Sequence, residues 1–129
     1  MSDKITCTYK GLSQVHIQVD EVADVLYTAH DEKKEFVTPG DMLVSALGAC
    51  TLTMMSVVAE KSGEKLDGAQ ITLTPTFGPN LSGLQAVELH IVFPENISEA
   101  TKKKCLIAAE KCPVHRSLNP AIKFTVTSN

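Results

Sequence analysis

Two stretches near the start of the chain alternate between apolar and polar residues. Residues 4–10 and 14–20 each keep their apolar side chains on one face, which is the period-two pattern of a half-buried β-strand. Residues 24–30 predict a weaker third strand, and a charged loop follows at 31–35. The residues expected to face inward are Ile5, Cys7 and Tyr9 in the first strand, then Val15, Ile17 and Val19 in the second.

The longest apolar stretch, residues 38–63, predicts one long helix. Residues 42–59 contain no charged side chain. Thr38 suits the N-cap, a proline follows at the first helical position, Asp41 lies three residues after the cap, and Gly63 suits a left-handed terminating residue. Because this helix is apolar around its whole circumference, one sheet cannot cover it. We therefore expect a second layer, supplied by another copy of the chain.

The second half of the chain predicts two strands, a helix and a closing strand. Residues 69–77 and 87–93 alternate as strands, Ser98 is placed to cap a helix that continues to about Lys111, and residues 122–126 alternate again. No repeat or linker interrupts this order, so we expect a single domain over residues 1–129. The inward residues should be Ile71, Leu73 and Phe77, then Val87, Leu89, Ile91 and Phe93, then Ile122, Phe124 and Val126, with Glu88 and His90 outward.

Composition narrows the function classes. A content of 43% hydrophobic and 21% charged residues is that of an ordinary globular domain, and a net charge of −3 argues against nucleic-acid binding. The only cationic run, residues 102–104, is interpreted as a solvated helix face. No secretory signal is recognised at the N-terminus, and residues 42–59 include serines, threonines and a glycine without flanking anchors. We therefore expect a cytoplasmic protein without a membrane span.

The candidate chemistry lies in four cysteines, which are not expected to form a structural disulfide framework in a cytosolic chain. Cys7 and Cys105 share the apolar faces of their elements and are expected in the core. Cys50 lies within the apolar helix, where a thiol is either inert packing or redox chemistry held away from water. Cys112 precedes a proline, which disfavours helical geometry and places it at a chain break.

Metal chemistry is weakly supported by the sequence. Cys112 and His115 have a C-x-x-H spacing, but a closed zinc site needs four ligands and no second pair at matching spacing exists. His115 is therefore interpreted as a surface or packing residue, His16 and His90 as surface residues, and no metal or cofactor is expected.

Two motifs carry a family resemblance. The segment PGDMLVSALGAC, followed about sixty residues later by AEKCPVHRSL, resembles the osmotically inducible and organic-hydroperoxide-resistance proteins of the OsmC/Ohr family. The resemblance covers nearly the whole chain. It implies an α+β class and an OsmC-like fold: antiparallel sheets around a long apolar central helix, in an intertwined homodimer with active sites at the subunit interface.

The resemblance also implies a reaction. Cys50 would attack the peroxide bond of an organic hydroperoxide and become a sulfenic acid, Cys112 would resolve it to a disulfide, and a dithiol reductant would reset the enzyme. Peroxidases of the family activate the attacking thiol with an arginine from the N-terminal sheet region, held by a glutamate near the start of the central helix. This chain has one arginine, Arg116, in the second motif, and the glutamate position matches Gly40 or Asp41.

Several alternatives stay open. The activating charge could come from Lys10, His16, Lys33, Lys34 or Arg116. Asp41 is either a carboxylate that favours the helix N-terminus or a site residue, and Arg116 either pairs with a helix end or carboxylate of its own motif or serves Cys50. The chain could also be a homologue without strong peroxidase activity that binds or senses a small hydrophobic or electrophilic molecule at the dimer interface, or a structural dimer with inert thiols.

Overall fold

The computed structural model describes residues 4–22, 26–29 and 36–129. The chain forms two compact units, residues 1–43 and 44–129, which are described separately. The first unit holds a sheet of three antiparallel strands, β1 (Ile5–Gly11), β2 (Gln14–Val19) and β3 (Leu26–Ala29), in the order β1-β2-β3. The three predicted strands are confirmed, although residues 24, 25 and 30 and the loop 31–35 lie outside the described residues.

The prediction that Cys7 belongs to the core is wrong for the single chain. Cys7 is exposed, as are the other residues of β1 up to Lys10. Alternation identifies the face that is suited to burial, but an edge strand is buried only when another layer covers it. His16, on the neighbouring strand β2, is half-buried.

Helix α1 (Pro39–Lys61) begins and ends close to the predicted residues. The Thr38 hydroxyl accepts a hydrogen bond from the Asp41 N–H, and the Asp41 carboxylate accepts one from the Thr38 N–H, both at 3.1 Å. This reciprocal pair is a capping box. At the other end Gly63 has a φ of +78°, and the Glu64 N–H donates to the Ala59 carbonyl. Both predicted helix signals are therefore confirmed.

Only one side of α1 is buried in the single chain. Its buried residues recur every three or four positions and therefore share a face. On the other side Ala46, Ala49 and Thr53 are exposed, and Val57 keeps 43% of its surface accessible. The buried residues are Val44, Leu47, Gly48, Thr51, Met55 and Ala59.

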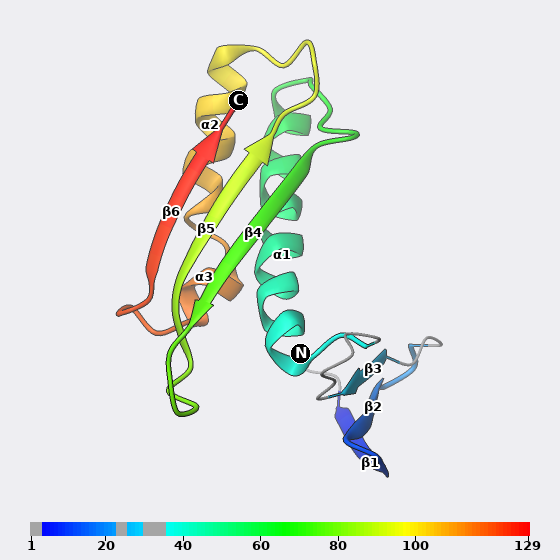
Figure 1. Cartoon of the computed structure of the whole chain (residues 1–129). Coiled ribbons are helices and arrows are strands. Elements are labelled where there is room, and N and C mark those ends of the chain that lie inside the picture. The colour runs from blue at the N-terminus through cyan, green and yellow to red at the C-terminus, as the bar shows by residue number, and fades with distance from the viewer. Residues whose placement is uncertain (1–3, 23–25, 30–35) are drawn as a thin grey trace. The chain divides into compact units, whose positions relative to one another are not determined.

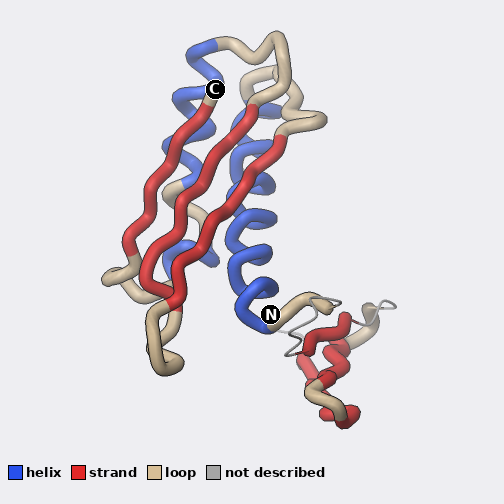
Figure 2. The backbone as a smooth tube through the Cα atoms, in the orientation of Figure 1, coloured by secondary structure: helices blue, strands red, loops and turns tan. Residues whose placement is uncertain are grey.

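The second unit is a sheet with helices on one face (Figures 1 and 2). Strands β4 (Gln70–Phe77), β5 (Leu84–Val92) and β6 (Lys123–Ser128) lie in the order β4-β5-β6. Helices α2 (Glu99–Ala109) and α3 (Pro113–Ser117) connect β5 to β6. The α+β class is confirmed.

The expectation of purely antiparallel sheets is wrong for this sheet. Strands β4 and β5 are antiparallel, but β5 and β6 pair in parallel, with Val87 opposite Phe124 and Leu89 opposite Val126. The physical reason is the connection, because a crossover through helices returns the chain to the same end of the sheet from which β5 started. A hairpin would have produced the antiparallel pairing that was expected.

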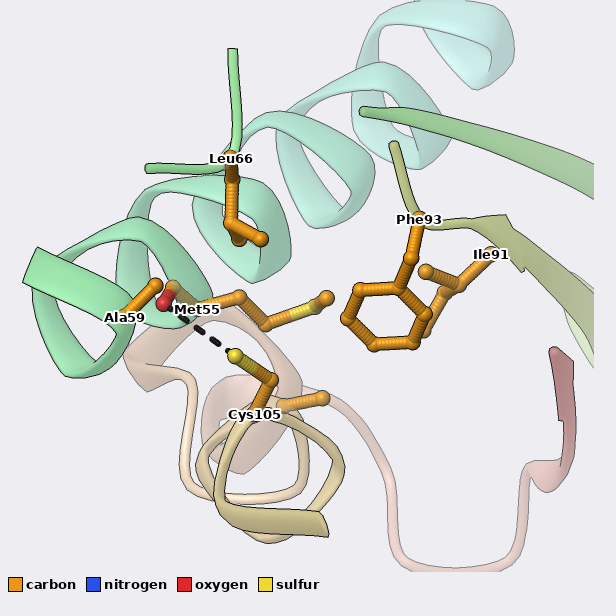
Figure 3. Packing of buried hydrophobic residues seen from close by; sticks show 7 residues of the cluster. Met55, Ala59, Leu66, Ile91, Phe93 and Cys105 are labelled. Carbon is orange, nitrogen blue, oxygen red and sulfur yellow. Dashed lines mark hydrogen bonds between the residues drawn. The ribbon is translucent and has the colours of Figure 1, made fainter. Parts of the chain in front are cut away.

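The core between α1, α2 and the sheet has two parts. In the first, shown in Figure 3, Met55 and Ile91 are fully buried and Phe93 nearly so. Cys105 is also fully buried there, its thiol donates to the Met55 carbonyl at 3.5 Å, and burial raises the pKa of that thiol. The prediction that Cys105 is a core residue is confirmed.

The alternation of the strands in this unit is confirmed except at Phe77 and Val126. Val87, Leu89, Ile91 and Phe93 are buried, while Glu88 and His90 are exposed. Phe77, expected inward, keeps 46% of its surface accessible because the pairing register shifts between Thr76 and Phe77. Val126, on the edge strand β6, is also exposed.

The start of α2 is tied to the segment that follows α1. Ser98 caps the helix as predicted, because its hydroxyl accepts from the Thr101 N–H. The Glu64 carboxylate accepts hydrogen bonds from the Thr101 hydroxyl and from the N–H and hydroxyl of Ser98. These bonds, that from Thr101 foremost, lower the pKa of Glu64. An anion at a helix N-terminus also interacts favourably with the helix dipole.

Candidate functional site

Cys50 and Cys112, far apart in the sequence, lie together in the second part of the core. Cys112 has no accessible surface and is clustered with Leu47, Val87 and Leu89, and the half-buried Cys50 packs against this cluster. Both thiols are free. The structure therefore brings together the two cysteines that the sequence motifs selected, between α1, β5 and the start of α3.

The local sequence determines the position of Cys112. It is the N-cap of α3 with an extended backbone (φ −58°, ψ 129°), and Pro113 occupies the first helical turn. The predicted break in helical geometry before the proline is confirmed. The backbone N–H groups of His115 and Val114, at the start of α3, lower the pKa of Cys112. The short helix α3 was not predicted, although a proline at the first helical position is a known start signal.

Burial raises the pKa of Cys112, and a hydrogen bond with Cys50 raises it further, against the smaller opposite effect of the two backbone donors. The burial of Cys112 therefore favours its protonated form.

The surroundings of the two thiols are apolar. The half-buried side chains around them come from α1, β4, β5, α3 and the segment leading into β6. His115 contributes indirectly, because its ring lies 4.1 Å from that of Phe124, centroid to centroid. The interpretation of His115 as a packing residue is thus confirmed. The partly buried members of the cluster are Cys50, Met54, Ile71, Leu73, Leu84, Val114, Leu118, Ile122 and Phe124.

The charged residues considered for a role in the site, as far as the structure describes them, are not part of the cluster that holds the two thiols. Asp41 takes part in the capping box of α1, so its structural role is confirmed, while a role in the site stays a prediction. Arg116 is exposed on α3, and among the described residues it forms no ion pair. Lys10 and His16 belong to the first unit, and Lys33 and Lys34 lie outside the described residues. No group of three or more possible metal ligands gathers in the described parts of the chain.

Comparison with known proteins identifies the family. The model of the family described as OsmC-like protein matches residues 29–127. The chain belongs to the OsmC-like protein family. The match includes both Cys50 and Cys112, and it spans α1 and all elements of the second unit. No curated protein matches the chain.

Solved structures share the OsmC-like fold over the whole chain. A Psychrobacter arcticus protein named for osmotic stress induction and a detoxification response has a TM-score of 0.90 at 22% identity, and an OsmC-like protein of Mycoplasma pneumoniae has 0.85 at 20%. An organic hydroperoxide resistance protein of Elizabethkingia anophelis has 0.79 at 18%. Each alignment covers 100% of this chain and 96% of the other. At these identities the likeness establishes the fold of this OsmC-like protein.

Proposed function

We propose that this OsmC-like protein is a thiol-dependent peroxidase that reduces organic hydroperoxides. The observation that carries the proposal is the pair of free thiols, Cys50 half-buried and Cys112 fully buried, within one apolar cluster. Membership of the family and the fold shared with an organic hydroperoxide resistance protein support a redox role. Apolar surroundings favour an organic peroxide over hydrogen peroxide.

Accessibility assigns the two roles. A peroxide must reach the sulfur it oxidises; Cys112 is fully buried, whereas Cys50 is half-buried. Cys112 has no accessible surface, which shields it from peroxide, and it lies in the same cluster as Cys50, so it is placed to react with an intermediate formed there. We therefore assign Cys50 as the attacking residue and Cys112 as the resolving residue.

The proposed steps balance as follows. The Cys50 thiolate attacks the terminal peroxide oxygen, the O–O bond breaks, and the leaving alkoxide takes a proton to become the alcohol, leaving Cys50 as a sulfenic acid. The Cys112 sulfur then attacks the Cys50 sulfur, forming the disulfide and releasing water. A dithiol reductant reduces the disulfide, is itself oxidised to a disulfide, and returns both thiols. These three steps use only thiols, the peroxide and the dithiol reductant.

We propose Arg116 as the source of the positive charge that activates Cys50, with Lys10, His16, Lys33 and Lys34 as the alternatives; as a carboxylate, Asp41 could serve the site only by holding that cation. Arg116 follows Cys112 by four residues on α3, and its N–H donates to the Cys112 carbonyl at 3.0 Å. Arg116→Ala should lower the second-order rate of peroxide reduction, while Arg116→Lys should retain part of it. Asp41→Asn should leave the rate unchanged if Asp41 only caps α1.

The decisive experiment measures thiol loss with cumene hydroperoxide and with hydrogen peroxide. Wild type should lose two thiols per peroxide reduced, and Cys50→Ser should lose none. Cys112→Ser should form the Cys50 sulfenic acid without converting it to a disulfide, so that excess peroxide oxidises it further. Cys105→Ser is the matched control, because it removes a buried thiol from the other part of the core, and it should behave as wild type. Absence of thiol loss in wild type would overturn the peroxidase proposal.

We further propose that the exposed side of α1 packs against a second copy of the chain. Helix α1 is the one described helix that is long and apolar enough to span a membrane, and only 33% of its most apolar window is buried. Length and composition alone are weak evidence for a span, because the core helix of a globular protein has the same composition. A homodimer would cover the exposed side and place Cys50 beside the interface.

The dimer is tested by mass measurement in solution. Wild type should have twice the 13.9 kDa of one chain. Ala49→Arg places a charge on the exposed side of α1 and should shift the protein toward the single-chain mass. Ala100→Arg makes the same change at an exposed position of α2 and should not. A wild-type protein with the mass of one chain would contradict the dimer.

A binding or sensing role at the same interface is the alternative. This alternative predicts two results together: Cys50 reacts with an alkylating probe, and the protein shows no dithiol-dependent peroxide turnover. Unreactive Cys50 in the native protein would instead indicate a structural dimer.

A further inference from the structure

An apolar groove lies between α1 and α2, beside the candidate site. Its volume is about 340 Å³ and its lining is almost entirely apolar, which is within the range of small-molecule pockets, roughly 300–1,000 Å³. Met54 and Val58 line it from α1, and Ile107 and Ala108 line it from α2. Ile107 keeps 58% of its surface accessible although it is apolar.

Two lysines complete the lining of this groove. Lys104 and Lys111 are seven residues apart, so they lie on the same side of α2 and its C-terminal end, with Ile107 between them. In the described residues the only ion pair is that of Lys102 with Glu99, which leaves both groove lysines without a carboxylate at salt-bridge distance. The positive charge of Lys104 also lowers the pKa of Glu64, beyond salt-bridge distance. The groove therefore combines an apolar lining with two available positive charges.

We propose that this groove binds a medium-chain carboxylate, with the alkyl chain on Met54, Val58 and Ile107 and the carboxylate on Lys104 or Lys111. Charge complementarity selects this ligand over a neutral one. An alkyl chain alone would be held only by burial of its surface, whereas an ammonium group within reach adds a charge-assisted hydrogen bond to the carboxylate. Nucleic acid does not fit, because two lysines around an apolar groove provide no basic surface.

The groove is adjacent to the thiols through Met54. Met54 follows Cys50 by one helical turn, and it also packs in the cluster that contains Cys112. A bound chain would therefore lie next to the candidate site. The proposed binding does not depend on the peroxidase reaction, since it is measured with a ligand that cannot oxidise a thiol.

Binding is tested by calorimetric titration of the full chain with decanoate and, in a separate arm, with decanoate methyl ester. We expect saturable binding of decanoate and about two- to fivefold weaker binding of the ester, because the ester lacks the charge. Lys104→Glu combined with Lys111→Glu should weaken decanoate binding by about tenfold or more. Lys103→Glu combined with Lys123→Glu is the matched control, because it makes the same total charge change at two exposed positions outside the groove, and it should bind as wild type.

A second variant tests the apolar part of the groove. Ile107→Asn is placed at a largely exposed position that the fold should tolerate, and it should weaken both ligands. Equal binding of decanoate and its ester, or unchanged binding in the double lysine variant, would overturn the proposal. A third result would also overturn the proposal: decanoate binding that converts a dimer to single chains and does not depend on the two lysines. The groove would then be a contact between copies of the chain.

Discussion

Gly48 tests how closely α1 approaches the sheet. A β-carbon added at Gly48 would lie 2.6 Å from Cδ1 of Leu73 and 3.5 Å from Cγ2 of Ile71. Replacing glycine by alanine inside a helix normally stabilises a protein by about 1 kcal/mol. Forcing an extra carbon into a packed site costs about 1–3 kcal/mol. We therefore expect Gly48→Ala to destabilise the protein by about 0–2 kcal/mol instead of stabilising it.

The assay is urea unfolding at equal protein concentration. A double-mutant cycle with Leu73→Ala removes the side chain that the added carbon would meet. In a Leu73→Ala background the space is vacated, so Gly48→Ala should stabilise by about 1 kcal/mol. The difference between Lys103→Ala and Lys103→Gly, at an exposed position of α2, measures the same backbone effect without any steric contact. Stabilisation by Gly48→Ala in the wild-type background equal to that at position 103 would refute the close approach.

Three further predictions concern a cap, a carboxylate and a thiol. Thr38→Ala should destabilise the protein by about 1 kcal/mol, because the first turn of α1 loses a side-chain acceptor, while Thr38→Ser should retain the stability in the same urea assay. Hydrogen bonds, that from Thr101 foremost, lower the pKa of Glu64 in the folded protein. Its stabilisation should therefore be complete above the unfolded value of about 4.3 and be lost as the pH falls through the folded value. Melting temperatures of wild type and Glu64→Gln should converge below pH 4, and a constant difference down to pH 3 would contradict the assignment. Burial raises the pKa of Cys105, so in the native protein at pH 8 iodoacetamide should modify the exposed Cys7 first, as followed by mass spectrometry, and equal rates would contradict the described burial.

The sequence predicted those features that depend on local signals. Thr38 and Asp41 predict the start of α1, because a capping box needs only two residues three positions apart. Gly63 predicts its end, because few other residues tolerate a positive φ. The inward residues of β5 were predicted because both neighbouring strands and the helices fix its alternation. The proximity of Cys50 and Cys112 came from family motifs and not from local pattern.

The failures share a physical cause, which is that they depend on partners distant in the sequence. The parallel pairing of β6 follows from the crossover through α2 and α3, which no periodicity reports. Phe77 is exposed because of a register shift against β5, and Cys7 because its strand is an edge.

The parallel partner of β5 also affects how the chain is made. Residues of the Cys112 cluster include Ile122 and Phe124, which are synthesised after α2 and α3. At ribosomal speeds of about 5–20 residues per second, the interval between the end of β5 and the start of β6 is roughly 2–6 seconds. Until β6 is made, β5 has an open edge, and Cys50, followed by Cys112 once it is synthesised, lacks the cover of Ile122 and Phe124. We therefore expect the nascent chain to be more open to oxidation and to misassociation than the finished protein.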